Sequence, residues 1–137
     1  MIFFKLFLLI QITIFRLTNG RLMASMRGMP VLLLNTVGRK TGKKRTTPLM
    51  YVKDGDDFII TASNNGRDHH PGWFYNLKEC PQVTIEVPDR KLLVNASVAT
   101  KEESARLWPI LISEAPFFDK YRKGTSRNIP MVVLRAP

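Results

Sequence analysis

The sequence predicts an α+β domain in which about six strands form a barrel or a strongly bent sheet with helices attached. Three observations lead to this fold class. The chain has 137 residues, the length of a single domain with a sizeable core. Short apolar or alternating runs recur along it, separated by turn-forming residues. Segments with helical spacing are few, and no repeat or linker divides the chain.

Residues 1–17, MIFFKLFLLIQITIFRL, predict an amphipathic helix with a wide apolar face. Lys5 and Arg16 interrupt the run, which falls short of the about 20 apolar residues of a membrane-spanning helix. An Asn-Gly pair, typical of helix C-termini, follows it. We expect this helix either to pack on the domain or to lie on a membrane surface, and a true membrane anchor is the alternative. The predicted organisation is therefore a helix with its linker over 1–28 and a barrel over 29–137.

The rest of the chain is mainly β. Runs rich in apolar and β-branched residues predict strands at 30–37, within 45–63 (two strands), at 82–87, at 91–99 and at 129–136. Asp54 and Gly55 interrupt the 45–63 segment and are a strong hairpin signal. A Pro-Asp-Arg turn separates the next two runs, which predicts a second hairpin.

Helices are predicted at 71–80 and 101–114, and a short helix or turn at 116–121. Pro71 is suited to the start of a helix, and Trp73 and Leu77 follow at helical spacing. Thr100 and Glu103 have the spacing of a capping box, which predicts that the second helix begins between them.

Lysine and arginine outnumber aspartate and glutamate by 21 − 11 = 10. So basic a chain favours an anionic partner: a nucleic acid, an acidic membrane surface, or a phosphorylated or carboxylated small molecule. The single cysteine, Cys80, cannot form an internal disulfide, which is typical of a reducing compartment. His69 and His70 have no third ligand at a suitable spacing, so we expect a solvent-facing pair and no metal site.

Much of this charge lies in one turn. The stretch NTVGRKTGKKRTTPL, residues 35–49, contains the cations Arg39, Lys40, Lys43, Lys44 and Arg45. Gly38 and Gly42 allow a tight turn, in which consecutive backbone N–H groups can bind an anion. The residue order differs from that of a Walker A loop. Taken alone, the turn is either an anion site or a solvated hairpin tip that is kept basic for solubility.

Two neighbouring segments favour the anion site. The stretch TASNNG, residues 61–66, is a second polar turn at the end of a strand. The helix after Pro71 opens with aromatic residues, and the N–H groups at a helix N-terminus also favour anions. Together these features suit a flat, aromatic, phosphorylated ligand.

These segments resemble a known family. The stretch PVLLLNTVGRKTGKKRTTPLMYVKDGDDFIITASNNGRDHHPGWFYNL looks like the signature of the deazaflavin-dependent nitroreductases, actinobacterial reductases that use coenzyme F420. The segments FRLTNGRL, ATKEESARLWPIL and RNIPMVVL extend the resemblance over nearly the whole chain. It implies a split β-barrel like that of flavin reductases. It also implies hydride transfer from the reduced deazaflavin to a quinone, nitroaromatic or enone-like acceptor.

The resemblance also implies site residues. Those expected to hold the phosphate and acidic tail of the coenzyme are Arg39, Lys40, Thr41 and Arg45. Those expected around the ring are Thr46, Thr47, Pro48, Leu49 and Met50, then Thr61, Ala62, Ser63 and Asn64, and then Gly72, Trp73, Phe74, Tyr75 and Asn76. Ser63 and Tyr121 are candidates to give a hydrogen bond or a proton to the acceptor. The alternatives are that Ser63 only binds coenzyme and that Tyr121 only packs on its helix.

Two other functions are alternatives to this one. The chain is alternatively an FMN-binding split barrel, or a non-enzymatic basic barrel that binds nucleic acid or an anionic membrane. Its aromatic residues are predicted mainly on helices, which argues against nucleic acid. We expect a cytoplasmic enzyme with peripheral contact to the inner membrane face through residues 1–17. Because split barrels often dimerise, a homodimer is also considered.

Overall fold

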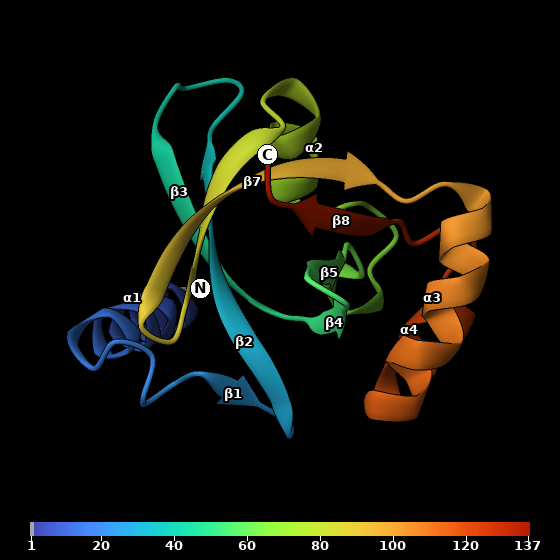
Figure 1. Cartoon of the computed structure of the whole chain (residues 1–137), viewed down its shortest axis with the longest axis horizontal. Helices are drawn as coiled ribbons and strands as arrows, with labels where there is room; N and C mark the ends of the chain where they lie inside the picture. The colour runs from blue at the N-terminus through green and yellow to red at the C-terminus, as the bar shows by residue number, and fades with distance from the viewer. Residues whose placement is uncertain (1) are drawn as a thin grey trace.

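The protein is built on an antiparallel sheet that curls around a helix (Figure 1). The computed structural model describes residues 2–137, apart from the side chain of Asn65. Met1, part of the predicted first helix, lies outside the described residues. The strands are β1 (Ser25–Met26), β2 (Met29–Val37), β3 (Lys44–Met50), β4 (Val52–Asp54), β5 (Asp57–Thr61), β6 (Gln82–Val87), β7 (Arg90–Val98) and β8 (Met131–Arg135). The helices are α1 (Ile2–Leu17), α2 (Gly72–Glu79), α3 (Lys101–Glu114) and α4 (Phe117–Lys123), with a 3₁₀ turn η1 (Asn64–Gly66).

The sheet nearly closes on itself. Its strand order is β1-β2-β6-β7-β8-β5-β4, and β3 pairs with β2 beside this path. Only Tyr51 separates β3 from β4, so a single stretch of chain pairs with β2 at one end and with β5 at the other. The backbone N–H of Tyr51 donates to the carbonyl of Pro30 at 3.1 Å, which joins the bend to the strand beside it. The predicted bent sheet is thus confirmed.

The core lies in two clusters, one inside the curl and one outside it. Inside, α2 inserts Trp73, Phe74 and Leu77 among strand residues such as Leu32 and Ile60. Outside, α3 and α4 cover the other face of the strands with Leu107, Trp108, Leu111 and Phe118. Figure 1 shows these two helices at the opposite end of the molecule from α1. The position of α2 brings its N-terminus opposite the β2–β3 turn, so that both line one cavity.

The structure has eight strands where about six were predicted, because β1 was not predicted and the segment 45–63 forms three strands in place of two. Several predicted local signals do end elements where expected. The N–H of Glu103 donates to Oγ1 of Thr100 at 3.1 Å, and the N–H of Thr100 donates to Oε1 of Glu103 at 3.0 Å, which completes the capping box of α3. Gly20, with φ of 78°, donates to the carbonyl of Phe15 and follows the end of α1. Gly55, with φ of 61°, forms the β4–β5 hairpin turn.

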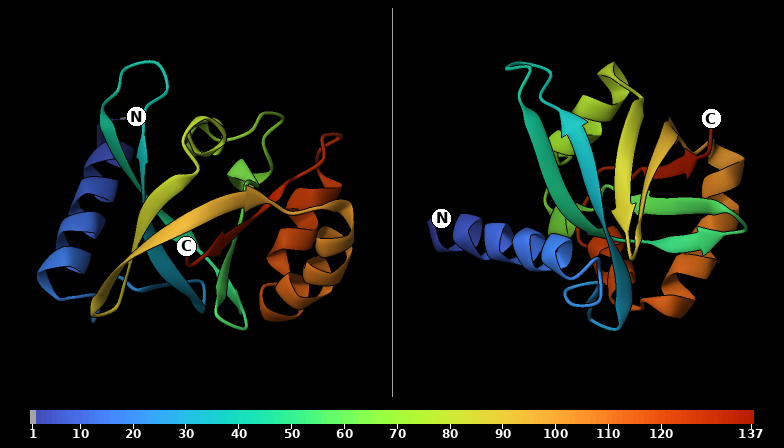
Figure 2. Two further views of the ribbon diagram at one scale, coloured as in Figure 1. Left: turned by 45° about the horizontal axis from the view of Figure 1, so that its top comes forward. Right: turned by 60° about the vertical axis from the view of Figure 1, so that its left-hand side comes forward.

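The first helix packs on the barrel mainly through its C-terminal half. Gln11 and Phe15 are its buried residues, and the described helices include none long and apolar enough to cross a membrane. Figure 2 shows α1 extending outward, with its N-terminus farthest from the strands. Large apolar side chains on this helix are therefore exposed: Ile2, Phe3, Phe4, Leu6, Phe7, Leu9, Ile10 and Leu17.

A polar network fixes the C-terminal half of α1 to the sheet. Arg16 makes a two-pronged ion pair with Glu86 of β6, with Nη2–Oε2 at 2.8 Å and Nε–Oε1 at 3.1 Å. Its Nη2 also donates to Asn35 and to Thr46. The polar arc of the predicted amphipathic helix thus includes a docking contact, while much of the apolar face is turned to solvent.

Candidate active site

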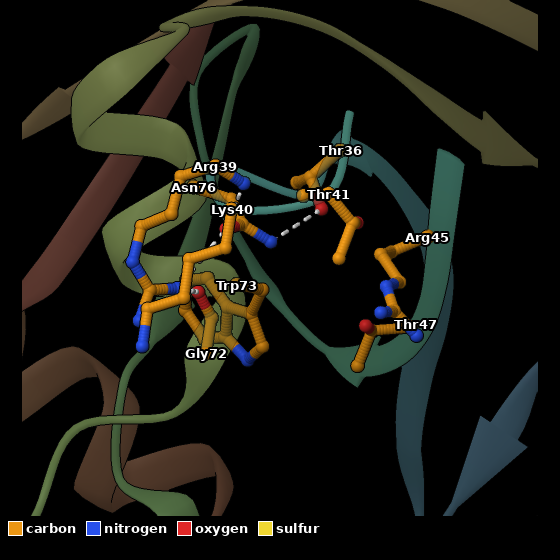
Figure 3. A pocket seen from close by; sticks show the side chains of 10 residues that line it. Thr36, Arg39, Lys40, Thr41, Arg45, Thr47, Gly72, Trp73 and Asn76 are labelled. Carbon is orange, nitrogen blue, oxygen red and sulfur yellow. Dashed lines mark hydrogen bonds between the residues drawn. The ribbon is translucent and has the colours of Figure 1, made fainter. Parts of the chain in front are cut away.

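An open cavity of about 430 Å³ lies between the β2–β3 turn and the start of α2 (Figure 3). Its size is typical of small-molecule sites. The lining residues are Thr36, Gly38, Arg39, Lys40, Thr41, Arg45, Thr47, Gly72, Trp73 and Asn76. In Figure 3 the β3 side chains of Arg45 and Thr47 face Arg39 and Lys40 across the opening. The cavity therefore unites the basic turn with the aromatic helix, two segments that are far apart in the sequence.

Short backbone hydrogen bonds shape the basic turn. The N–H of Gly38 donates to the carbonyl of Lys43, and the N–H of Gly42 donates to the carbonyl of Gly38, both at 2.8 Å. A Cβ on Gly38 would lie only 2.7 Å from Oγ1 of Thr41, so a side chain there would force the turn or the Thr41 side chain to shift. Gly42 has φ of 72°, a conformation that side chains disfavour. The two glycines that predicted a tight turn are thus both needed by its geometry.

Asn76 joins the turn to α2. Its Oδ1 accepts from the backbone N–H of Arg39 and from Nη1 of the same arginine, both at 3.2 Å. Its Nδ2 donates to Oγ1 of Thr36 at 3.3 Å. The Arg39 guanidinium also lies over the ring of Tyr75, 4.9 Å from its centre. Arg39 is therefore held in place at the rim of the cavity.

The cavity carries positive charge that no carboxylate balances. Among residues 2–137, the ion pairs that form involve none of the cations of the basic turn. The first turn of α2 adds the partial positive charge of a helix N-terminus, at Gly72 and Trp73. Guanidinium, ammonium and hydroxyl donors around one opening are suited to phosphate and carboxylate oxygens.

Strand β3 presents its predicted site residues to two different faces. Arg45 and Thr47 line the cavity, and Leu49 packs on the core inside the curl. Thr46 is turned away, because its Oγ1 donates to Asn35 at 2.7 Å and accepts from Arg16 at 3.2 Å. Met50 packs on the outer core beneath α3 and α4. A strand alternates its side chains between faces, so the predicted run 46–50 does not face one ligand as a whole.

The other predicted residues do not line this cavity. Thr61 ends β5, Pro48 is half-buried on β3, and Phe74 is buried in the inner core. Ala62 and Ser63 follow β5 and are also buried, while Asn64, with φ of 48°, begins η1 and donates to the carbonyl of His69 at 3.1 Å. Tyr75 lies outside, under the Arg39 guanidinium.

The two candidate proton donors lie on adjacent elements. Ser63 immediately precedes η1 and is 8% exposed. Tyr121 on α4 contacts the same turn, since a Cβ on Gly66 would lie 3.3 Å from Cδ1 of Tyr121. The hydroxyl of Tyr121 accepts from Nη1 of Arg27 at 2.8 Å. Neither residue lines the cavity at the basic turn, and a catalytic role for either stays a prediction.

Sequence reasoning missed two arginines and misjudged one histidine. Arg27 reaches Tyr121 from the β1–β2 turn, and Arg127 binds the loop between β5 and α2. His70, expected to face solvent, is half-buried, and its Nδ1 lies 2.8 Å from Nη1 of Arg127. Both arginines act across long sequence separations, and no local spacing predicts such contacts.

Comparison with known proteins decides the family. Residues 8–136 match the family model of the F420H(2)-dependent quinone reductases. The chain belongs to this family. It is 43% identical over 125 residues to an F420H(2)-dependent quinone reductase of Mycobacterium tuberculosis, covering 88% of this chain and 84% of the relative. The predicted F420-dependent reductase, with coenzyme F420 as its cofactor, is therefore confirmed, and the FMN and nucleic-acid alternatives gain no support.

Solved structures confirm the split-barrel fold of this quinone reductase family member. An F420-H2-dependent reductase, FDR-A, superposes with a TM-score of 0.71 at 33% identity, covering 77% of this chain and 94% of that chain. A second structure, described as a domain-swapped dimer, gives a TM-score of 0.73 at 29% identity and covers 92% of this chain and 96% of its own.

Proposed function

We propose that this protein passes a hydride from reduced F420 to a quinone, and that the cavity at the basic turn holds the anionic part of the coenzyme. The observation that supports this most is the set of unbalanced cations around one opening, Arg39, Lys40 and Arg45, beside the buried Trp73. The coenzyme carries a phosphate and carboxylates on a flat ring system, and these donors and this indole match both parts. The reduced deazaflavin ring supplies the hydride.

The residues of the chain then have distinct tasks. Arg39, fixed by Asn76, and Arg45 on β3 would neutralise the phosphate from two sides, and Thr41 and Thr47 would add hydroxyl donors. Trp73 would cover one side of the ligand with apolar surface. Catalysis of this kind depends mainly on orientation of the two reactants and on stabilisation of the charge that develops on the acceptor oxygen.

Ser63 and Tyr121 are the proposed donors to the acceptor. Because the Tyr121 oxygen accepts from Arg27, its own O–H proton is free to point elsewhere. The Arg27 charge would also stabilise negative charge on that phenol as it gives up a proton. Nitroaromatic and enone-like compounds are proposed as further acceptors, since they develop negative oxygen in the same way.

The proposal is tested first by binding. Purified protein is titrated with F420, with FMN and with a single-stranded DNA oligonucleotide, each followed by fluorescence. We expect F420 to bind most tightly. Reduced F420 is then mixed with the protein and a soluble naphthoquinone, and its oxidation is followed by absorbance. Preferential binding of FMN, or no quinone-dependent oxidation, would overturn the proposal.

For localisation, we propose a cytoplasmic enzyme that touches the inner membrane face through α1. The exposed Phe3, Phe4 and Phe7 side chains support this, since aromatic and aliphatic residues on one helix partition into the membrane interface. Flotation with anionic vesicles would compare the wild type with a Phe3→Ser plus Phe7→Ser variant. Equal flotation of both would contradict the contact. Leu93→Ser, on an exposed β7 side chain, is the matched control.

We also propose a homodimer, supported by the similar structure that is a domain-swapped dimer. Sedimentation velocity over a concentration series, without vesicles, would measure the mass in solution. A monomer at every concentration would exclude the dimer.

A further inference from the structure

The loop between β5 and α2 takes its shape from one distant arginine. Arg127, in the segment between α4 and β8, donates from Nη2 to the carbonyls of Ser63 at 2.8 Å and Ala62 at 3.1 Å. Its Nε donates to the carbonyl of Arg67 at 2.8 Å. Its Nη1 lies 2.8 Å from Nδ1 of His70. One planar guanidinium thus binds the beginning, the middle and the end of the loop.

His70 connects this arginine to α2. Its ring packs against Phe74, with centres 4.8 Å apart, and against Tyr75, with centres 5.8 Å apart. One residue further along α2, Asn76 holds Arg39 at the cavity. A continuous set of contacts therefore runs from Arg127 through His70 and the first turns of α2 to Arg39 at the cavity.

The contact requires a neutral imidazole. A guanidinium only donates hydrogen bonds, so Nδ1 of His70 must accept, and the ring proton must then lie on Nε2. Burial lowers the pKa of His70, and the charges of Arg127 and Lys78 lower it further. The titratable Tyr75 also faces the ring from α2. On the histidine's own loop, Asp68 accepts a hydrogen bond from Thr125 at 3.3 Å.

We propose that Arg127 is a positioning residue for the coenzyme site, and that neutral His70 is the acceptor that lets it hold the loop against α2. Protonation of His70 places a second donor in front of the guanidinium, which breaks the contact, loosens the loop and weakens F420 binding. The inference rests on the proposed function for its ligand, but the loop itself is tested without any ligand.

The first experiment replaces the arginine. Arg127→Lys keeps the charge but cannot reach three parts of the loop at once, and we expect its F420 Kd to rise about tenfold. In the ligand-free variant, amide hydrogen exchange over 62–70 should quicken while that of β6 and β7 is unchanged. The matched control is Arg106→Lys, which alters a two-pronged ion pair with Asp54 elsewhere on the surface. Wild-type exchange and wild-type Kd in Arg127→Lys would overturn the proposal.

The second experiment tests the histidine by pH. His70→Asn keeps an acceptor near the Nδ1 position and does not titrate, and His69→Asn is the control on the exposed neighbour. As the pH falls from 7.5 to 5, we expect the Kd of the wild type and His69→Asn to rise severalfold more than that of His70→Asn. Ionisation of F420 itself affects all three proteins alike and cancels in the ratios.

Parallel pH curves for the wild type and His70→Asn would overturn the role of His70. If the wild type failed to bind F420 at pH 7.5, the proposed function would fail instead. Exchange over 62–70 in the ligand-free wild type and His70→Asn would then still decide between a pH-sensitive contact and none.

Discussion

Asn76 binds Arg39 twice: its Oδ1 accepts from the backbone N–H and from Nη1, each at 3.2 Å. The amide is buried, with 7% of its surface exposed, and its Nδ2 donates to Thr36 at 3.3 Å. One side chain therefore sets the distance between the basic turn and the helix that face each other across the cavity.

Asn76→Leu and Asn76→Asp separate the contribution of this amide to stability from its effect on F420 binding. Asn76→Leu leaves the Arg39 N–H without its acceptor, and we expect a loss of about 1–3 kcal/mol in the free energy of unfolding, with weaker F420 binding. Asn76→Asp keeps the acceptor but brings a negative charge to the anion site. We therefore expect F420 affinity to fall at least about tenfold, with a smaller loss of stability. Urea unfolding and fluorescence titration measure the two effects, and wild-type affinity in both variants would contradict them.

The cations that line the cavity predict that F420 affinity depends on salt. Arg39→Ala plus Arg45→Ala should lower F420 affinity by about a hundredfold or more at low ionic strength, because hydrogen bonds to charged groups contribute about 1.5–3 kcal/mol each. The difference from wild type should shrink as salt is added, because salt screens the attraction that Arg39 and Arg45 exert on the coenzyme in the wild type. Arg90→Ala plus Lys91→Ala removes the same charge from the β6–β7 hairpin and should leave affinity nearly unchanged. Equal losses in the two double variants would mean that net charge alone attracts the coenzyme.

The docking of α1 should depend on pH through Glu86. Burial alone would raise the pKa of Glu86, but hydrogen bonds from Arg16 and Asn35 outweigh it and hold the pKa below its usual 4.5. A lowered carboxyl pKa stabilises the fold fully above about pH 4.5, and this stabilisation disappears as the pH falls through the lowered value. Urea unfolding from pH 3 to 7 should show the wild type more stable than Glu86→Gln at pH 6 and nearly equal to it at pH 3. A difference in stability between the wild type and Glu86→Gln that stays constant from pH 3 to 7 would contradict this role of Glu86.

The turn glycine can be tested with its neighbour. In Gly38→Ala the new Cβ must move away from Oγ1 of Thr41, which widens the turn, and F420 binding should weaken. Thr41→Ala alone should also weaken binding, because it removes a proposed hydroxyl donor, but it should cost less in the Gly38→Ala chain, where it also removes the clash. A double-mutant cycle on Kd measures this coupling, and strictly additive effects would show that the two residues do not clash. Gly42→Ala meets no atom within 4 Å and should cost only the strain of its positive φ, about 1 kcal/mol.

Local sequence signals predicted the helices, the turn and the longer strands, though not the two-residue β1, because each depends on residues within a few positions. The capping box of Thr100 and Glu103 and the glycines at 38 and 42 are of this kind. The sequence did not predict the break at Tyr51, because that residue marks where the chain exchanges one partner strand for another. Partner exchange depends on the three-dimensional arrangement, and alternation within the strand carries no sign of it.

The candidate site shows the same division. The basic turn and the aromatic helix start were visible as local clusters, and the structure places them at one cavity. Arg27 and Arg127 were missed because each looks like an ordinary surface arginine in the sequence, yet binds a residue more than fifty positions away. The pleat of a strand predicts that the side chains of Thr46 and Thr47 point to opposite faces. The family resemblance implied instead that residues 46–50 all lie along the ring.

Those two threonines also limit how the protein can change. Thr46 binds the α1 network and Thr47 lines the cavity, so β3 alone separates the outward helix from the cavity. A slip of one residue in its pairing would exchange the two surfaces, turning Thr46 inward and Thr47 toward Arg16. Insertions or deletions at the tip of the β2–β3 hairpin therefore keep both the α1 contact and the cavity lining only when they lengthen or shorten the loop and leave the register of β3 unchanged.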